Sequence, residues 1–429
     1  MENSVKNLIQ FIDHSPSCFH VIENAKKQFL EHGFIQLEEK EHWNLEEGKS
    51  YFVERNGSSM IAFHLPKKDF QGFHIVASHS DSPTYRIKEQ PEMSVEKHYT
   101  KLNIERYGGM IPETWFDRPL SVAGRIIIEE NGQIKDQLVN VDRDLMIIPN
   151  LAIHMSRSSN ESKQLNPQKD LLPLCGGNLT KDGFEEMIAK ESGVEKEDIL
   201  SYDLFLYNRM RGTTLGINEE FVVAPKLDDL ECAYSSIEGM LNAKLSKDYV
   251  TVCAVFDNEE VGSGTKQGAG STFFPEVLKR ISYLCGKNEE EYYMAVADSF
   301  MLSADNAHAV HPNYQDKTDP TNRPYINEGI VLKYNASQKY TTDANSAALV
   351  KYLCKKEKIK CQVFFNRSDM LGGSTLGNIL TGQVSIKAAD IGLPQLSMHS
   401  TYETAGCKDL DDMITLMGSF YELGKEVQI

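Results

Sequence analysis

Residues 251–262 read TVCAVFDNEEVG, an apolar run that ends in a cluster of acidic side chains. The run Thr251–Phe256 is short and bounded by charge, which is typical of a strand buried on both faces of a sheet. Asp257, Glu259 and Glu260 follow directly. Acidic groups at the end of a buried strand cost free energy unless something compensates them, and a divalent cation does so well. The stretch therefore predicts a metal-binding edge of a sheet, with a solvated acidic turn as the alternative.

The two adjacent glutamates are expected to have different roles. Neighbouring side chains of an extended segment point to opposite sides of the backbone. In an extended segment, one of Glu259 and Glu260 would therefore bind a metal ion while the other stays free to act as a base.

The rest of the chain alternates apolar strands with amphipathic helices. Further buried strands are expected at residues 73–78, 293–297 and 330–333. Helices are expected at the N-terminus, after Asp228 and near the C-terminus, where apolar residues recur every three or four positions. This pattern predicts an α/β fold with a mostly parallel sheet flanked by helices.

Residues 88–215 have a different pattern. Short β-type runs separated by turn signals such as Asn131-Gly132 favour antiparallel hairpins, and they are expected at residues 125–129, 137–141 and 145–148. Residues 156–169 are polar and are expected to form a long loop. The simplest partition is a discontinuous domain of residues 1–87 and 216–429 that carries an inserted β-rich domain, residues 88–215.

Charge and composition narrow the functional class. The 429 residues include 45 Lys and Arg against 62 Asp and Glu, a formal net charge of −17. Such acidity argues against binding to nucleic acid or to anionic membranes, because both need a positive surface. We find no signal peptide and no apolar run of the ~18 residues that a spanning helix needs. The eight cysteines are scattered without a CxxC pair, as expected for reduced thiols in a cytoplasmic protein.

Four other segments carry side chains of the kind that bind metals. The candidate ligands are His79 after the strand at 73–78, Asp228 at the start of a helix, Asp305 in the loop 303–313, and His399 in the segment 397–404. Each has a simpler alternative: a strand-end histidine, a helix N-cap, a polar loop, and a capping or core histidine, respectively. Asp81 would hold the imidazole of His79 in one tautomer.

Taken together, these residues favour a metal centre. Two imidazoles and four carboxylates, counting Glu259 and Glu260, are too many for one tetrahedral zinc ion. They suit two ions that share a carboxylate, as in two-metal hydrolases. Mixed nitrogen and oxygen ligands favour zinc, manganese or cobalt over calcium.

The order of the motifs along the chain resembles that of the aspartyl aminopeptidase family of dinuclear zinc exopeptidases. The motifs are FIDHSPSCFH, ASHSDSPTYRIK, YGGMIPETWFDRPLSVAGR, IPNLAIHM, EEFVVAPKLDDL, FDNEEVGSGTKQGA, LSADNAHAVHPNY and PQLSMHSTYETAG. Together they cover nearly the whole chain. Two departures are HSD where the family more often has HTD, and KLDDL where RLDNL is common.

The resemblance implies a role for each candidate. His79, Asp228 and Asp305 would hold one metal ion, and Asp228, Glu260 and His399 would hold the other, with Asp228 bridging the two. Glu259 would be the general base toward a water that bridges the ions, and Asp81 would orient His79. Lys333 and Tyr340 would line the pocket for the first substrate residue with His308 nearby, and His154 would lie near a subunit interface and the active site.

The resemblance also implies a zinc-exopeptidase-like catalytic domain with an inserted dimerisation domain. Dimers of this kind would build a homo-oligomer, a tetrahedral dodecamer with an enclosed chamber. The expected activity is removal of N-terminal Asp or Glu from peptides with two zinc ions per subunit.

Other functions are left open. The first is an aminopeptidase of broad or neutral specificity. The second is a non-catalytic shell protein, which should have lost a ligand or the base. A glycosidase using Asp257 and Glu259 would leave His79, His399 and Asp305 unexplained.

Overall fold

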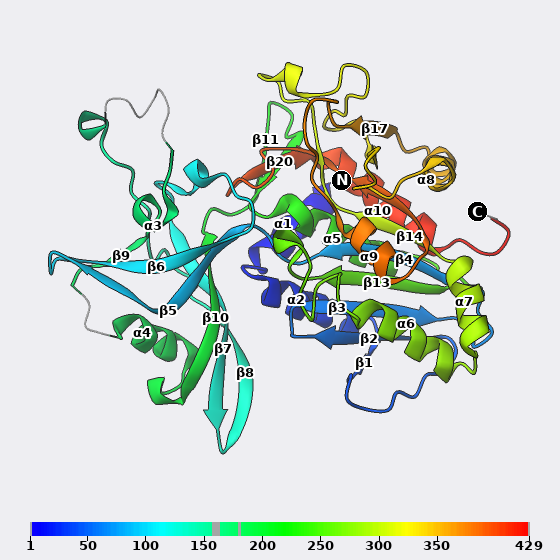
Figure 1. Cartoon of the computed structure of the whole chain (residues 1–429), viewed down its shortest axis with the longest axis horizontal. Coiled ribbons are helices and arrows are strands. Elements are labelled where there is room, and N and C mark those ends of the chain that lie inside the picture. Colours follow the sequence, from blue (N-terminus) through cyan, green and yellow to red (C-terminus); the bar gives the residue numbers. More distant parts are fainter. Residues whose placement is uncertain (1, 157–163, 179–181, 428–429) are drawn as a thin grey trace.

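The computed structural model describes residues 2–156, 164–178 and 182–427. A large helix-covered sheet occupies the right of Figure 1, and a second, twisted sheet lies beside it on the left. The chain passes from the first body to the second at Thr84 and returns after Asn208.

The larger body is built on a sheet that has nine strands in the described residues. Their spatial order is β1 (Ile35–Leu37), β2 (Lys49–Arg55), β3 (Ser59–Leu65), β13 (Val250–Phe256), β4 (Phe73–His79), β14 (Phe300–Ala304), β18 (Lys387–Gly392), β16 (Ile330–Tyr334) and β17 (Cys361–Phe365). The central strands β13, β4, β14 and β18 are mutually parallel, whereas β3 and β16 pair antiparallel to them. The expected α/β fold with a mostly parallel sheet is confirmed.

Helices cover both faces of this sheet. They are α1 (Glu2–Asp13), α2 (Cys18–Glu31), α5 (Leu227–Asn242), α6 (Phe273–Leu284), α7 (Glu289–Ala297), α8 (Ala344–Glu357), α9 (Leu376–Gln383) and α10 (Cys407–Tyr421). Alternate residues of β13 serve the two faces: Cys253 and Val255 pack with α5 and α10, while Val252 and Ala254 pack with α6 and α9. None of the described helices is long and apolar enough to cross a membrane.

The second body is β-rich. Among the described residues its sheet has the order β8 (Gln133–Asn140), β7 (Leu120–Glu130), β10 (Ile199–Asn208), β5 (Thr84–Val95), β6 (Tyr99–Tyr107) and β9 (Leu174–Gly176), with antiparallel pairing throughout. Two short helices, α3 (Pro167–Asp170) and α4 (Gly183–Ser192), accompany it. The exact boundaries of the insert at 88 and 215 stay a prediction.

A third, small sheet lies beside the larger body. In the described residues its order is β11 (Thr213–Leu215), β12 (Phe221–Ala224), β20 (Glu403–Gly406), β19 (Pro394–Leu396) and β15 (Ala307–His308). It brings the segment that precedes Asp228 next to the segment that follows His399.

Some local expectations were wrong. Residues 293–297 are the end of helix α7, because Asn288 and Glu291 form a capping box that starts a helix there. Residues 145–148 form only isolated bridges to Leu120, Phe116 and Leu174. Of the loop expected at 156–169, residues 157–163 lie outside the described residues, and residues 167–170 form α3.

Candidate active site

Three of the candidate segments meet at one edge of the large sheet. His79 is the last residue of β4, Glu259 and Glu260 follow β13, and Asp305 follows β14. These three strands are parallel neighbours, so their carboxyl ends lie together. The carboxyl edge of an open α/β sheet is where such folds place their functional groups.

Asp228 and His399 reach this edge from outside the sheet. Asp228 lies at the start of α5, whose N-cap residue is Lys226 and has no side-chain capping bond. The helix is also kinked at Asp228 itself, but neither oxygen of Asp228 is shown accepting a backbone N–H: Oδ1 has no hydrogen-bond partner in the described structure and Oδ2 faces His399. The N-cap alternative for Asp228 is therefore wrong. His399 lies in the loop between β19 and β20 with a φ of 67°, and its ring faces Asp228 and Glu260.

The distances between these side chains fit bound metal ions. Asp228 places Oδ1 3.7 Å from Nε2 of His79 and Oδ2 3.2 Å from Nε2 of His399. Oε1 of Glu260 lies 3.4 Å from the same nitrogen of His399. Ligand atoms about 2.1 Å from a tetrahedral ion are roughly 3.4 Å apart. The two oxygens of Asp228 thus face two different histidines, as a bridging carboxylate would.

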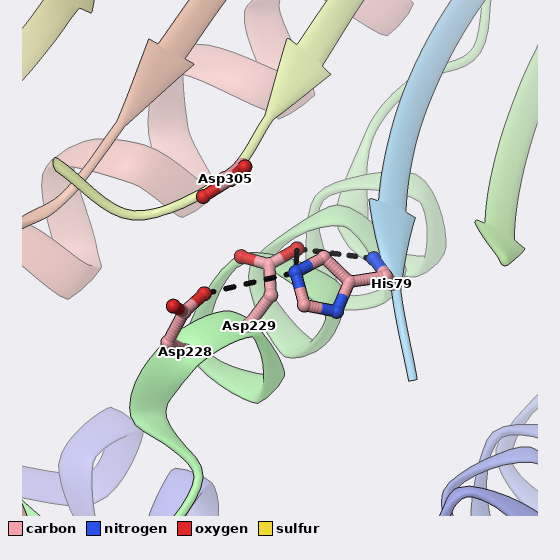
Figure 2. Close-up of side chains that lie close together, drawn as sticks. All are labelled: His79, Asp228, Asp229 and Asp305. Carbon is pink, nitrogen blue, oxygen red and sulfur yellow. Dashed lines mark hydrogen bonds and ion pairs between the residues drawn. The ribbon is translucent and has the colours of Figure 1, made fainter. Parts of the chain in front are cut away.

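Figure 2 shows one side of this cluster, where His79, Asp228, Asp229 and Asp305 converge. These four residues can each offer a ligand atom within 4.8 Å of the others, and so can the group Asp228, Glu260 and His399. Oδ1 of Asp228 and Oε1 of Glu260 are buried without a hydrogen-bond partner in the described structure. The site therefore holds oxygen atoms that a cation would satisfy.

The geometry of the two glutamates differs from the extended segment expected. Glu259 and Glu260 lie in a short 3₁₀ turn, η5 (Glu259–Val261), after Asn258 in a left-handed conformation. They still diverge, because Glu260 faces His399 while Glu259 lines a cavity beside His79.

The protonation behaviour of the cluster reflects buried negative charge. Burial, with neighbouring acidic groups, raises the pKa of Glu259 to about 8 and that of Glu260 well above its usual value. Burial would also raise the pKa of Asp228, but its contacts with the rings of His399 and His79 lower it below its usual value. Burial opposes protonation of His399, yet its contact with Asp228 raises its pKa to about 10. A bound cation would relieve this excess of carboxylates.

Asp81 has a second role that the sequence did not indicate, because it also holds the backbone of Glu259 and Glu260. The Nδ1 of His79 hydrogen-bonds the Asp81 backbone carbonyl at 3.0 Å and lies 3.4 Å from the carboxylate. The carboxylate accepts the backbone N–H groups of Glu259 at 3.1 Å and Glu260 at 3.2 Å, and the hydroxyl of Tyr107 at 2.7 Å. Asp81 therefore fixes the turn that carries both glutamates as well as the ring of His79.

Glu403 is a positioning residue that sequence reasoning missed. Its buried carboxylate accepts the backbone N–H of Asp228 at 3.0 Å and of His399 at 2.6 Å. One side chain thus connects two segments that carry candidate ligands. Its only signal in the sequence is its place in the motif that contains His399.

The β-rich body also contributes to the site. The carbonyl of Gly109 contacts Nδ1 of His399 at 2.5 Å, and the N–H of Ile111 donates to the His399 carbonyl at 3.0 Å. Gly108 has a φ of +79°, and a Cβ there would lie 3.1 Å from Cβ of Glu260. A glycine is therefore needed for this loop to approach the site.

The expected substrate residues divide into two groups. Lys333, Tyr340 and His308 line one cavity together with His79, Glu259, Asp305 and His399. His154 lies in the exposed turn η2 (Ile153–Met155) and does not line this cavity. Within the single chain, the structure therefore does not bring His154 to the other site residues.

Histidine and carboxylate side chains that could bind metal, gathered beside a cavity at the carboxyl edge of a parallel sheet, are typical of metal-dependent hydrolases. The sequence profile described as "Aminopeptidase I zinc metalloprotease (M18)" matches residues 11–421. The chain belongs to this M18 family. It is therefore a metallo-aminopeptidase, and the family resemblance of its motifs is confirmed.

Individual relatives support this assignment. A "Probable M18 family aminopeptidase 2" of Clostridium acetobutylicum is 45% identical, over 97% of this chain and 98% of that protein. A chain of the cryo-EM structure of the Ape4 and Nbr1 complex matches with a TM-score of 0.95 at 36% identity, covering 98% of this chain and 85% of that chain. The S. cerevisiae mApe1 dodecamer matches with a TM-score of 0.85 at 26% identity, covering 98% of this chain and 97% of that chain.

The role of Glu403 can be tested by Glu403→Gln. A glutamine has one acceptor oxygen, so one of the two N–H groups loses its partner and faces an amide donor instead. We expect zinc affinity to fall about 10- to 100-fold, the usual effect of losing a group that orients metal ligands. Zinc content after dialysis against a weak chelator measures this.

A matched control is Glu422→Gln, because exposed Glu422 also accepts a backbone N–H, from Lys244 at 3.0 Å. Its zinc content should equal that of the parent protein. Unchanged zinc affinity in the Glu403 variant would show that the hydrogen bonds from Glu403 to Asp228 and His399 do not position the ligands.

Proposed function

We propose that this metallo-aminopeptidase removes N-terminal Asp or Glu from peptides, with two metal ions per chain and Glu259 as the general base. Zinc is the proposed metal, with manganese or cobalt as substitutes. The observation that carries the two-ion proposal is Asp228, whose two oxygens face different histidines. The cytoplasm is the proposed location.

The residues suggest how peptide hydrolysis would proceed. When bound, the ions would supply Lewis acidity that stabilises negative charge on the carbonyl oxygen in the transition state. Glu259 lines the cavity, is half-buried, and has its backbone held by Asp81. Its carboxylate would accept a proton from the attacking water and return it to the leaving amine. A fixed turn keeps the base in place while its side chain stays free to exchange the proton.

Lys333 supports the preference for an acidic residue. Its side chain is buried at the wall of the cavity, and its ammonium donates to the carbonyls of Asp305 at 2.8 Å and Asn306 at 3.2 Å. An ammonium has three N–H donors, so one remains. A substrate carboxylate entering a desolvated pocket needs such a fixed positive partner. The Nζ of the same lysine lies 3.6 Å from Oδ1 of Asp305, so its positive charge also forms an ion pair with a proposed metal ligand.

Assembly is the last part of the proposal. Leu151, Ile153 and Met155 are 52%, 47% and 76% exposed within five residues of the β-rich body. Apolar side chains gathered in this way are typical of surfaces that a partner covers. The S. cerevisiae relative is described as a dodecamer. We propose a homo-oligomer of the same kind, built from dimers, in which His154 would approach a neighbouring subunit.

Replacing the base tests the mechanism. Glu259→Gln should lower kcat at least ~10³-fold, because general acid–base catalysis contributes up to ~10⁴-fold. Its metal content should stay at the parent value. Glu260→Gln is the matched variant, and it should lose metal because its side chain faces His399. The opposite pattern, with metal lost only from the Glu259 variant, would mean that the two roles are reversed.

Replacing the pocket lysine tests the substrate preference. Lys333→Met should lower kcat/KM for N-terminal Asp or Glu substrates ~10²–10³-fold, or about 3–4 kcal/mol, because the substrate carboxylate is left buried without a partner. Substrates with N-terminal leucine should change far less. The comparison uses assembled protein with verified metal content.

Lys339→Met is the control, since Lys339 also donates to a backbone carbonyl, that of Gly372, but does not line the cavity. It should behave as the parent does. An equal loss on acidic and neutral substrates in the Lys333 variant would assign Lys333 to supporting Asp305. A parent without acidic preference would leave a broad-specificity aminopeptidase.

Light scattering tests the assembly. We expect a particle near twelve times the 48.4 kDa of one chain, because an interface of this class should be stable at working concentrations. Met155→Glu should shift the distribution to smaller species. Leu284→Glu, which changes an exposed apolar residue of α6 instead, should not. A 48 kDa particle in the parent protein would contradict the proposal.

A further inference from the structure

Asp229 is a fully buried carboxylate beside the proposed bridging ligand, and neither the sequence motifs nor the proposed mechanism gives it a role. Its Oδ2 accepts the backbone N–H of His79 at 3.0 Å and lies 4.0 Å from Nε2 of the same ring. Its Oδ1 accepts no hydrogen bond from a nitrogen or hydroxyl donor among the described residues, while the carboxylate as a whole interacts with the buried thiol of Cys232. One oxygen therefore holds the end of β4, and the other has no evident function.

The direction in which Oδ1 of Asp229 points indicates which group it could bind. In Figure 2 one oxygen of Asp229 is joined to His79, and the other turns toward the space between Asp228 and Asp305. Asp229 can offer a ligand atom within 4.8 Å of those of His79, Asp228 and Asp305. A buried carboxylate oxygen without a partner is costly, and a cation in this space would compensate it.

We propose that Asp229 is a further ligand of the ion held by His79, Asp228 and Asp305, an inference that rests on the proposed two-ion centre. This ion would then have one imidazole and three carboxylates around it before any solvent binds. Oxygen-rich sites suit manganese, whereas imidazole-rich and thiolate-rich sites suit zinc. Asp229 would therefore shift the preference of this one ion toward Mn²⁺.

The alternative is that Asp229 only holds the N–H of His79. An asparagine could accept the same N–H through its amide oxygen. The family commonly has RLDNL where this chain has KLDDL, so asparagine is common at the position of Asp229. Only the negative charge distinguishes the two roles. Asp229→Asn keeps the size and the acceptor and removes the charge, so it separates ligation from backbone support.

The experiment measures metal binding rather than turnover. Metal-free protein is titrated with Mn²⁺ and with Zn²⁺ against a chromogenic chelator, on the full assembled chain. In Asp229→Asn we expect one of the two Mn²⁺ dissociation constants to rise about 10- to 100-fold, with a smaller rise for Zn²⁺. Thermal melting of the metal-free variant should match the parent, which shows that the fold is kept.

Glu231→Gln is the matched control. Glu231 lies on the same helix, is equally buried, and also has an oxygen without a partner, but its other oxygen accepts from Asn306 at 3.2 Å, outside the ligand cluster. Removal of this charge should leave both Mn²⁺ constants unchanged. An equal effect of both variants would assign the shift to general electrostatics and overturn the proposal.

Cobalt spectroscopy gives a second readout, which reports the coordination number of the ion and not its affinity. Four-coordinate Co²⁺ absorbs visible light more strongly than five-coordinate Co²⁺. With one Asp229 oxygen and one solvent ligand, the first ion in the parent should have the weaker, five-coordinate bands, and Asp229→Asn should have stronger ones.

The possible results separate the two proposals. A parent that binds two ions, with Mn²⁺ affinity and cobalt bands unchanged in Asp229→Asn, overturns the role of Asp229 alone. A parent that binds no metal overturns the two-ion centre, and this inference with it.

Discussion

Negative charge buried at the carboxyl edge of strands β13, β4 and β14 constrains the rest of the site. Carboxylates that follow β13 and β14 and carboxylates at the start of α5 form overlapping groups whose possible ligand atoms lie within 4.8 Å, and only two imidazoles, His79 and His399, lie among them. Such a cluster is unfavourable without cations, because burial disfavours the ionised form of each carboxylate in it. The fold therefore needs a framework that holds these groups together when no ion is bound.

Hydrogen bonds to backbone N–H groups provide that framework. Asp81 accepts from Glu259 and Glu260, and Glu403 accepts from Asp228 and His399. In both cases a buried carboxylate holds the main chain of a candidate ligand rather than its side chain. Charge-assisted bonds of this kind are stronger than neutral ones, so the ligand geometry is fixed before any ion arrives.

The sequence allowed the large sheet and the candidate residues at its edge to be predicted, because buried strands have a recognisable apolar pattern and functional groups follow their ends. His79, Glu260 and Asp305 were candidates on this basis, whereas Asp228 and His399 were candidates as ligand-type residues at a helix start and in a loop. The structure gathers all five. Glu403 and the second role of Asp81 could not be predicted, because an acceptor of a distant N–H leaves no periodic signal. The segment 293–297 was misjudged because its apolar letters outweighed the capping box before it.

The loop of Gly108–Ile111 belongs to the β-rich body yet touches the histidine at the centre of the site. The two bodies are consequently not interchangeable modules. A protein engineered to carry only the helix-covered sheet would keep His399 but lose the carbonyl that sets its ring and its tautomer. Conversely, any force that displaces the β-rich body, as packing in the proposed assembly would, acts directly on a candidate metal ligand. In the proposed assembly, contacts between subunits and the geometry of the candidate ligands would in this sense be mechanically linked.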